Sequence, residues 1–536
     1  MSETVLIPRI KAPEPQAGEP TDHGGVRSRF GLSARRRGRL PLAVVLVAQA
    51  SLAMSLTNSA FVDEACYLFS GRTEWVALFG GTAPNMDYAT FFSGSPYLYP
   101  LIGAVANAVG GLGAARGMSL LCMLGATIML YRATVLLFGR RAAIWASSLF
   151  ALCGPVLFMS HLATFDAPAV FLLAAGFWYA VRSGGDKVFM LETIALTTLG
   201  VAFKYTALVY AIPIVLVAAI CAIASVGWRW AAVRGVVLGA LMSLAGFALL
   251  CLAGPSTVTG LMSTTLNRPT ATNTVHQVAH RSAVYVGFIL ILALFGSLWF
   301  ILRRRPTAQH DGVRKGPLTD GWGWKARALL AAVLTGAALI APLGDMRLHT
   351  LTSLEKHAGY GLLFAASLGG WLIDKLAGRA WWRIVPAIAL VGSLGAFGAN
   401  QAHEFFGEWL NSTSYVQSLK SVTADYPQGT HILAEDPWVE RYYLGNAGSR
   451  FTWNDTYGLT FTTASGKTLT GVAAYQAAIS ERYFSVVFID YNATPGLDLA
   501  LDQMLATNGY QRTSIPSFDR YGRTDVEIWT LIGVRG

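Results

Sequence analysis

The chain has 536 residues, of which 53% are hydrophobic and only 13% are charged. A soluble globular protein carries about 25% charged residues, so this composition excludes a simple soluble enzyme, a disordered scaffold and a fibrous protein, and it indicates a multi-pass membrane protein. The net charge of +11 does not indicate nucleic-acid binding, because eight of the basic residues lie in the first 39 positions, before the first apolar stretch.

Residues 1–39 are rich in proline, glycine and charge, which predicts a disordered basic cytoplasmic tail. The tail ends in a run of arginines at 35–39, a pattern typical of the cytoplasmic side of a membrane anchor. No small-residue cleavage site follows the first apolar stretch, so we expect no cleaved signal peptide.

Eleven apolar stretches are long enough to be interpreted as transmembrane helices. They lie at 41–60, 117–138, 142–163, 167–181, 188–203, 205–227, 235–253, 282–302, 328–344, 358–373 and 384–399. A further stretch, 97–113, is shorter and contains Asn107, and we interpret it as a helix lying in the outer interface. The predicted transmembrane domain covers 40–399, with interfacial helices of its first outer loop at 61–113.

Charge in the connecting loops sets the predicted orientation. With eleven spans and a cytoplasmic amino terminus, the inner loops hold 16 Lys and Arg residues and the outer loops hold 7. Counting 97–113 as a span would place the most basic loop, 303–327, outside. The positive-inside rule therefore favours eleven spans in the inner or plasma membrane of a cell, with residues 400–536 outside the cytoplasm.

The tail 400–536 is polar and contains no cysteine. Strand-like runs at 431–434, 484–489 and 526–531 alternate with helical patterns near 415–425, 471–482 and 497–508. This alternation predicts a small extracytoplasmic α/β domain. The fold class predicted for the chain is thus an all-α polytopic membrane protein with a small α/β domain at its carboxyl end.

Charged groups at the outer membrane edge are candidates for function, because charge is costly there. Asp63 and Glu64 follow the first span and are flanked by apolar residues. Asp166 stands where the third and fourth spans meet, and Lys204 alone separates the fifth from the sixth. The alternative interpretations are helix N-caps for the acids and a lysine that only reaches toward water.

Further candidates lie in the outer loops. The loop 345–357 contains Arg347, Lys356 and His357, and the loop 254–281 contains Arg268. Tyr67 and His161 stand close to the acids in sequence and are candidates for acceptor contacts. The alternative for both loops is an ordinary solvated or covering segment.

Acids and bases gathered on one side of a helical bundle suit a reaction with a hydroxyl nucleophile and an anionic leaving group. A carboxylate takes the hydroxyl proton, and lysine or arginine holds a phosphate as negative charge builds on it. The cysteines form no disulfide framework and no zinc pattern. The sequence indicates no metal or cofactor, although it leaves divalent-metal dependence open.

The chain resembles the membrane glycosyltransferases of the GT-C superfamily, within them the PMT/ArnT-like branch, over about 40–375. The resemblance rests on the order and sidedness of a few features. These are Asp63-Glu64 after the first span, an amphipathic outer loop, Asp166-x-Pro168 after the third span and Gly200-x-x-x-Lys204 at the fifth–sixth junction. The sequence departs from the branch at Ser95-Pro96, where members often carry a basic residue, and it has no inserted β-trefoil.

The resemblance implies an enzyme that transfers a sugar, with inversion, from a polyprenyl-phosphate donor in the outer leaflet to a hydroxyl acceptor. It implies that Asp63 is the catalytic base, with Glu64 as its neighbour, and that Asp166 orients the acceptor or the sugar. Lys204 would contact the donor phosphate, assisted by Arg347, Lys356 or His357. The acceptor is a cell-wall glycan, a glycolipid or a protein, and the sequence selects neither acceptor nor sugar.

Two alternatives from other functional classes stay open. One is a transporter or flippase for polyprenyl-linked lipids or sugars, although no two halves of the chain match as transporter repeats do. The other is a non-catalytic cell-envelope assembly protein whose outer domain binds a partner.

Overall fold

The computed structural model describes residues 40–533 apart from 85, 185 and 304–316. The predicted tail 1–39 and most of the basic loop 303–327 lie outside the described residues. The chain divides into two units at Ala43, and of the first unit only the residues from Leu40 on are described, so the account below concerns Val44–Gly536.

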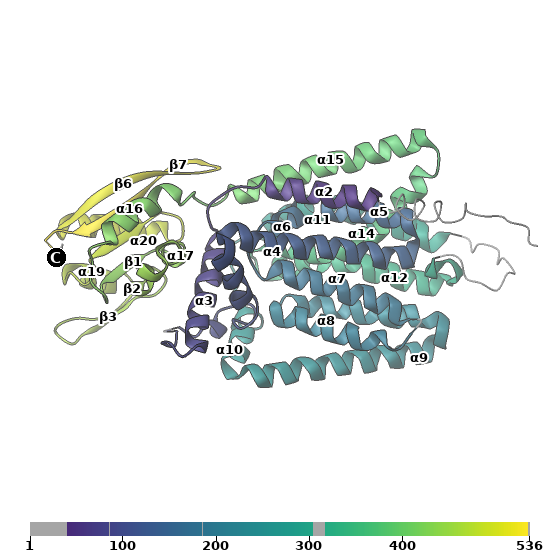
Figure 1. Ribbon diagram of the computed structural model, residues 1–536, viewed down its shortest axis with the longest axis horizontal. Helices are drawn as coiled ribbons and strands as arrows, with labels where there is room; N and C mark the ends of the chain where they lie inside the picture. The colour runs from purple at the N-terminus through teal and green to yellow at the C-terminus, as the bar shows by residue number, and fades with distance from the viewer. Residues whose placement is uncertain (1–39, 85, 185, 304–316, 534–536) are drawn as a thin grey trace, which may run out of the picture. The chain divides into compact units, whose positions relative to one another are not determined.

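Long apolar helices make up most of the described chain (Figure 1). Their bounds are α2 Leu40–Met54, α4 Tyr99–Phe138, α5 Arg140–Ala151, α6 Gly154–Ser160, α7 Asp166–Ser183, α8 Phe189–Phe203, α9 Ala207–Ala253, α11 Val275–Leu302, α12 Trp324–Gly336, α13 Ile340–Arg347, α14 Leu354–Ala377 and α15 Trp381–Phe406. Each of the eleven predicted spans coincides with all or part of one or two of these helices.

By length and composition, five helices of the described chain are able to cross a membrane. The pair α5 and α6, bent by 71°, would make a sixth, while α2 and α8 are shorter apolar helices. The mainly helical membrane fold is therefore confirmed, whereas the count of eleven spans stays a prediction.

Glycines break two of the long helices. Helix α9 joins two predicted spans, and its direction changes at Gly227, where φ is 76°, instead of in a loop over 228–234. Helix α4 breaks at Gly110 and Gly111, with φ of 64° at Gly111, which separates the segment expected in the interface from the one expected to span. Glycine adopts such positive φ values without strain, which explains why the helices break at these residues.

Helix α11 begins at Val275, ahead of the predicted start at 282. The Thr274 hydroxyl accepts a hydrogen bond from the Gln277 backbone N–H at 3.2 Å, and the Gln277 side chain accepts one from the Thr274 N–H at 2.8 Å. This reciprocal capping box satisfies two amide groups at the helix start, so the polar residues before 282 become helical.

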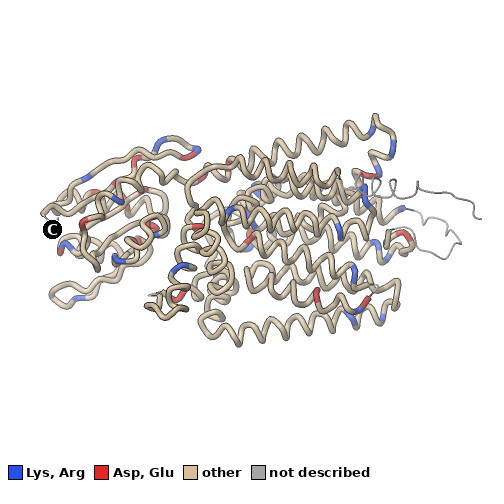
Figure 2. The backbone as a smooth tube through the Cα atoms, in the orientation of Figure 1, with Lys and Arg blue, Asp and Glu red and all other residues tan. Residues whose placement is uncertain are grey.

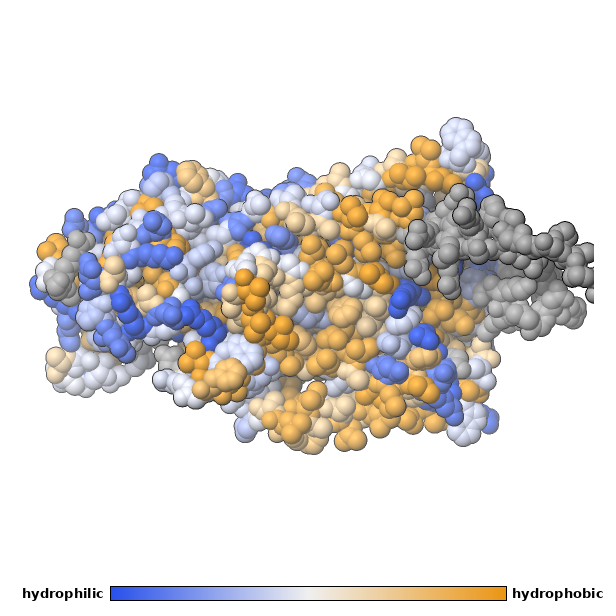
Figure 3. All heavy atoms as spheres, in the orientation of Figure 1, coloured by the Kyte–Doolittle hydropathy of each residue, from blue (hydrophilic) through white to orange (hydrophobic). Residues whose placement is uncertain are grey.

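The bundle packs closely around α14. A Cβ added to Gly370 would lie 2.3 Å from the backbone nitrogen of Ala146 on α5, so only glycine fits at this contact. The surface of the helices is apolar on the face that Figure 3 shows, and exposed side chains include Leu252, Phe295 and Ile388. Charged residues are sparse along the helices and gather near their ends (Figure 2). Such a surface is matched by lipid rather than water.

Shorter elements follow the helix ends: α3 Val62–Leu78, a 3₁₀ turn at Tyr88–Thr90, and α10 Pro255–Thr264. Gly71 of α3 lies against the Pro100 carbonyl at the start of α4, where an added Cβ would be 1.9 Å from the oxygen. The two elements therefore pack backbone to backbone.

The carboxyl-terminal region forms a five-stranded sheet in the order β2-β1-β5-β7-β6. Strands β2, β1 and β5 run parallel, and β7 joins β5 and β6 in antiparallel pairs. The bounds are β1 His431–Ala434, β2 Thr452–Asn454, β5 Val486–Ile489, β6 Tyr510–Asp519 and β7 Gly522–Leu531, and β3 Thr460–Thr462 pairs with β4 Thr468–Thr470. Its helices are α16 Thr413–Thr423, α17 Trp438–Leu444, α18 Asn446–Ser449, α19 Val472–Ser480 and α20 Pro495–Thr507. The three predicted strands and three predicted helices match β1, β5, β7, α16, α19 and α20, so the α/β region is confirmed.

This region buries an acid whose titration should be measurable. Burial raises the pKa of the Glu440 carboxyl, on α17, to about 8, and the nearby Asp436 and Glu435 carboxylates add to the rise. The folded protein then binds a proton that the unfolded chain releases near 4.5, so the free energy of unfolding falls as pH rises from about 4.5 to about 8.

We therefore expect Glu440→Gln to raise the melting temperature at pH 8.5 by about 5 °C and to change it little at pH 5. Thermal unfolding of the purified protein across this pH range checks the prediction. Parallel curves for the two proteins at all pH values would show that Glu440 does not titrate in this range.

Candidate active site

Two ion pairs, one fully buried and one partly exposed, join the ends of four helices. The Lys356 Nζ lies 2.6 Å from Asp63 Oδ2, and the Lys204 Nζ lies 2.6 Å from Asp166 Oδ1. The carboxylates come from the starts of α3 and α7, and the lysines come from the start of α14 and the end of α8. The structure thus brings together four residues that the sequence singled out separately.

Helix ends favour three of these placements. Asp63 and Asp166 lie in the first turns of their helices, and Lys204 caps the carboxyl end of α8, so each charge complements the helix dipole. Neither acid is an N-cap, because Phe61 and Phe165 hold those positions. Lys356 lies in a first turn, where a cation is disfavoured, and the Asp63 carboxylate compensates it.

The Asp166 carboxylate is enclosed and fully hydrogen bonded. It is 1% exposed. Its Oδ1 accepts from Lys204 at 2.6 Å and from the Tyr360 hydroxyl at 3.1 Å, and its Oδ2 accepts from the Thr164 hydroxyl at 3.1 Å. A buried charge with this many partners holds its neighbours in one arrangement.

Asp63 differs from the other three charges in its access to the surroundings. Its side chain is 31% exposed, whereas that of Lys356 is 3% exposed. The ammonium of Lys356 also lies 5.6 Å from the centre of the Phe61 ring. Asp63 is therefore the one carboxylate of these two ion pairs that is open to its surroundings.

Glu64 points away from this cluster and is completely buried. Its two oxygens accept from Arg116 Nε at 2.8 Å and Nη2 at 2.7 Å. They also accept from the backbone N–H groups of Ala163 at 2.7 Å and Phe61 at 2.9 Å. Arg116 in turn donates to the carbonyls of Asn58 and Ser59, both at 2.9 Å. Glu64 thus ties together α4 and the segments before α3 and α7.

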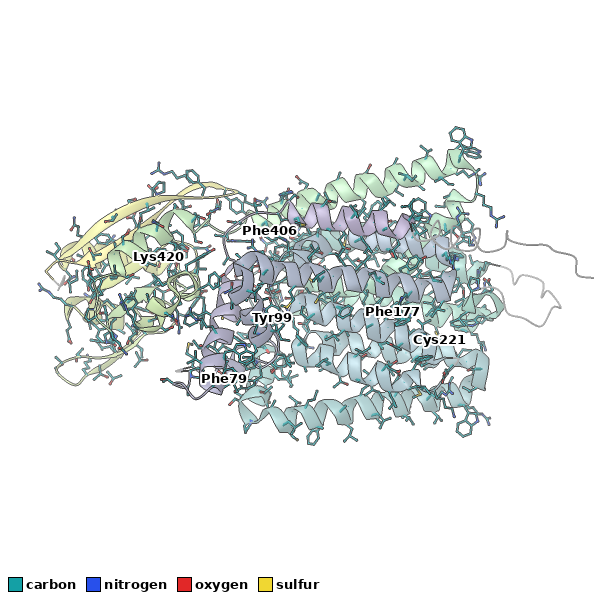
Figure 4. All side chains as sticks on the ribbon, viewed as in Figure 1. Phe79, Tyr99, Phe177, Cys221, Phe406 and Lys420 are labelled. Atoms are coloured by element: carbon teal, nitrogen blue, oxygen red, sulfur yellow. The ribbon has the colours of Figure 1, made fainter. Side chains whose placement is uncertain are left out.

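Two aromatic residues labelled in Figure 4, Phe406 and Tyr99, pack near the candidate residues. The Arg116 guanidinium lies 5.3 Å from the centre of the Phe406 ring, and His161 lies 5.8 Å from the same ring. Tyr67 packs its ring 4.3 Å from Phe165 and edge-on to Tyr99. His161 therefore belongs to the Glu64–Arg116 side, whereas Tyr67 forms part of the aromatic packing beside Asp166.

The remaining basic candidates spread around the ion pairs. His357 is buried, with Nδ1 3.6 Å from Asp345 Oδ2 and Nε2 3.5 Å from the Thr206 hydroxyl. Arg347 is exposed at the end of α13, and Arg268 lies in the loop after α10. Within the described part of the chain neither arginine forms an ion pair.

The two loops that carry these arginines are hydrogen bonded to each other. The Ala271 N–H donates to the Leu348 carbonyl at 2.9 Å, and the Asn273 N–H donates to the His349 carbonyl at 3.2 Å. The loop 254–281 is therefore anchored to the loop before Lys356.

Helix α17 of the carboxyl-terminal region contacts the helices that carry Asp63 and the interfacial segment. The Arg441 guanidinium lies between the rings of Phe69 on α3, at 4.6 Å, and Trp438, at 4.7 Å. The Tyr442 hydroxyl donates to Asn107 Oδ1 at 2.7 Å. The α/β region is thus part of the structure around Asp63.

Sequence reasoning missed Tyr360, Thr164 and Arg116. Tyr360 follows Lys356 by one helical turn, so spacing offered a signal for it, whereas Thr164 lies before the start of α7, where helical spacing gives none. Arg116 was visible as a charge at the edge of an apolar stretch, yet its partner Glu64 is distant in sequence. The described residues contain no group of three His, Cys, Asp or Glu side chains arranged to hold a metal ion.

The described chain thus combines an apolar helical bundle, paired acids and lysines at its helix ends, and an α/β region. Three solved structures have a similar fold. ArnT from Cupriavidus metallidurans bound to undecaprenyl phosphate has 14% identity and a TM-score of 0.55, covering 95% of this chain and 100% of its own. The oligosaccharyltransferase AglB from Archaeoglobus fulgidus, in complex with an inhibitory peptide and a dolichol-phosphate, has 10% identity and a TM-score of 0.55, covering 90% of this chain and 73% of its own. A variant of the arabinofuranosyltransferase AftD from Mycobacteria has 13% identity and a TM-score of 0.50, and the match covers 92% of this chain and 41% of AftD.

Residues 95–251 match the family described as dolichyl-phosphate-mannose-protein mannosyltransferase. No curated protein sequence matches the chain. The chain therefore has the GT-C fold and is related to the GT-C glycosyltransferases, which confirms the resemblance predicted from its sequence. The matched segment includes Asp166 and Lys204, whereas Asp63 and Lys356 lie outside it.

Proposed function

We propose that this protein transfers a sugar from a polyprenyl-phosphate donor to a hydroxyl acceptor at the extracytoplasmic face of the membrane. The observation that supports this reaction best is the pair of neighbouring ion pairs, in which Asp63 alone is partly open. The acceptor oxygen bonds to the anomeric carbon as the bond to the phosphate oxygen breaks, so the configuration inverts. The acceptor proton passes to Asp63, and the phosphate leaves with the bonding electrons.

Asp63 fits the role of base because it combines access with a fixed position. A base must come within about 2.6–3.2 Å of the hydroxyl that it deprotonates. The Lys356 ammonium holds one oxygen of Asp63 at 2.6 Å and so fixes the position of the carboxylate.

We assign the donor phosphate to the basic side of the cluster. Lys204 and Lys356 supply two positive charges, and His357, Arg347 and Arg268 extend the basic character into the outer loops. Negative charge grows on the phosphate as the sugar leaves, so preorganised cations stabilise the transition state more than the bound donor. Asp166 acts here as a positioning residue that sets Lys204 and Tyr360.

The reaction is tested with purified protein in liposomes that contain one polyprenyl-phosphate sugar at a time. We expect consumption of at least one such donor and release of polyprenyl phosphate when a mixture of cell-envelope glycans and glycolipids is supplied. Movement of a labelled donor across the bilayer without consumption would favour a flippase instead. No consumption and no movement for any donor would favour an assembly protein.

The orientation of the chain is tested separately at Lys420, an exposed residue of α16 (Figure 4). After the native cysteines are replaced, we expect Lys420→Cys to react with a membrane-impermeant thiol reagent on intact cells. Arg229→Cys, in the predicted inner segment 228–234, serves as the matched control and should react only after lysis. The reverse pattern would invert the topology and place Asp63 on the cytoplasmic side.

A further inference from the structure

A cavity of about 500 Å³ lies between the start of α8 and the turn of α9, far from the ion pairs. Its lining consists of Lys187, Met190, Val226, Trp230, Val233, Arg234 and Val237. Helix α8 begins beside this cavity and ends at Lys204, and its 15 residues extend about 22 Å at about 1.5 Å per residue. The cavity and the Asp166–Lys204 pair therefore lie at opposite ends of the same helix.

The lining combines two cations with apolar walls. Lys187 precedes α8, and Arg234 follows the turn at Gly227, so the two cations reach the cavity from different helices. No acidic residue is part of the lining. Asp186, the acid next to Lys187, uses its carboxylate to accept from the Val188 backbone N–H at 3.0 Å.

Arg234 is incompletely partnered. Among the described residues no group lies within hydrogen-bonding distance of its Nη1, although this atom is buried. A buried guanidinium nitrogen without an acceptor is costly, and an anion that entered the cavity would remove that cost. The indole of Trp230, which is 67% exposed, stands on the same wall, and tryptophan is favoured at the level of lipid headgroups.

We propose that this cavity binds the headgroup of an anionic diacyl phospholipid from the leaflet opposite the active site. The phosphate meets Lys187 and Arg234, and the acyl chains follow Met190, Val226 and the other apolar walls. A soluble phosphate ion is also an anion, but it would make no favourable contact with the apolar side chains of the lining. The bound phospholipid would contact residues on both sides of the turn at Gly227 and so stabilise it. It is a different molecule from the sugar donor and takes no part in the proposed reaction.

The test uses the delipidated full-length protein in detergent, with lipid binding counted by native mass spectrometry. We expect phosphatidylglycerol to bind more tightly than phosphatidylcholine of the same chain length. Each cation near an anionic headgroup contributes about fivefold in affinity, so Lys187→Gln/Arg234→Gln should weaken phosphatidylglycerol binding by about 25-fold. Phosphatidylcholine binding should be unchanged.

The control is Arg229→Gln/Arg379→Gln, which removes the same charge from exposed positions outside the lining. It should bind phosphatidylglycerol as the wild type does, and circular dichroism should show that both double variants are folded. Equal loss in the control, or equal binding of the two lipids by the wild type, would overturn the proposal. Competition of phosphatidylglycerol by millimolar inorganic phosphate would assign the site to a free anion and would overturn the lipid assignment.

Discussion

Replacing Asp63 with asparagine is expected to lower the rate of sugar transfer by about 10²–10⁴-fold, because loss of a general base has effects of this size. The amide keeps the shape of the carboxylate and still contacts Lys356, yet it cannot take up the acceptor proton. The variant should fold but with a lower melting temperature, because the Lys356 ammonium, whose side chain is 3% exposed, loses its counter-charge and keeps only an amide oxygen as partner. Donor binding should be largely retained, because the lysines remain. The measurement is a single-turnover transfer assay with the purified variant, alongside equilibrium binding of the donor.

The neighbouring acid provides the matched control. Glu64→Gln also changes one carboxylate to an amide, one residue along the same helix. Glu64 is completely buried and holds Arg116 through two hydrogen bonds, so this change leaves a buried guanidinium short of its counter-charge. Breaking a buried pair costs about 3–5 kcal/mol. We expect a lower melting temperature and yield, with turnover retained in each folded molecule.

The opposite ranking would reassign the base. If Glu64→Gln folds normally and loses transfer while Asp63→Asn remains active, Glu64 carries the proton. If both variants turn over as the wild type does, the first outer loop has no part in the chemistry.

The helices and strands were largely predictable from sequence because local pattern determines them. Apolar runs predicted the bundle, and runs at 431–434, 484–489 and 526–531 predicted strands that the structure contains. The ends of helices were less predictable. Helix α11, for example, begins earlier than expected because Thr274 forms a capping box at its start. The glycine turn in α9 at Gly227 was likewise hidden within an apolar stretch.

The candidate site shows where sequence reasoning stopped. Asp63, Asp166, Lys204 and Lys356 were each visible as charges at apolar boundaries. Their pairing was not visible, because Lys356 and Asp63 are 293 residues apart in the chain and only the fold of the bundle places the start of α14 near the start of α3. The same non-local packing separates Asp63 from Glu64, which share a sequence motif but face different partners.

The structure also gives Lys204 a partner within the protein. A lone lysine between two spans suggested that a donor phosphate must compensate its charge. Asp166 already does so at 2.6 Å, and both side chains are almost completely buried. The cation is therefore stable without a ligand, and contact with the donor becomes a separate question from the presence of the charge.

This leads to the second large expected effect. Lys204→Met should destabilise the protein by about 3–5 kcal/mol, because it leaves the Asp166 carboxylate buried with only the Tyr360 and Thr164 hydroxyls as partners. Lys356→Met is the control, since Asp63 is 31% exposed and water can solvate it after the loss. We expect a much smaller change in melting temperature for the control.

A double variant distinguishes the structural role of the Lys204–Asp166 ion pair from a role of Lys204 in binding the donor phosphate. Lys204→Met/Asp166→Asn removes both charges, and we expect it to recover most of the stability that the single change loses, giving a strong coupling energy in a double-mutant cycle. Sugar transfer should stay low in the double variant, because neither the cation nor its positioning carboxylate is restored. If Lys204→Met alone is as stable as the wild type and only its donor affinity falls, Lys204 is a phosphate ligand whose charge Asp166 does not need. If the double variant recovers both stability and transfer, the pair serves the fold alone, and the donor phosphate must be held by Lys356 and the basic groups of the outer loops.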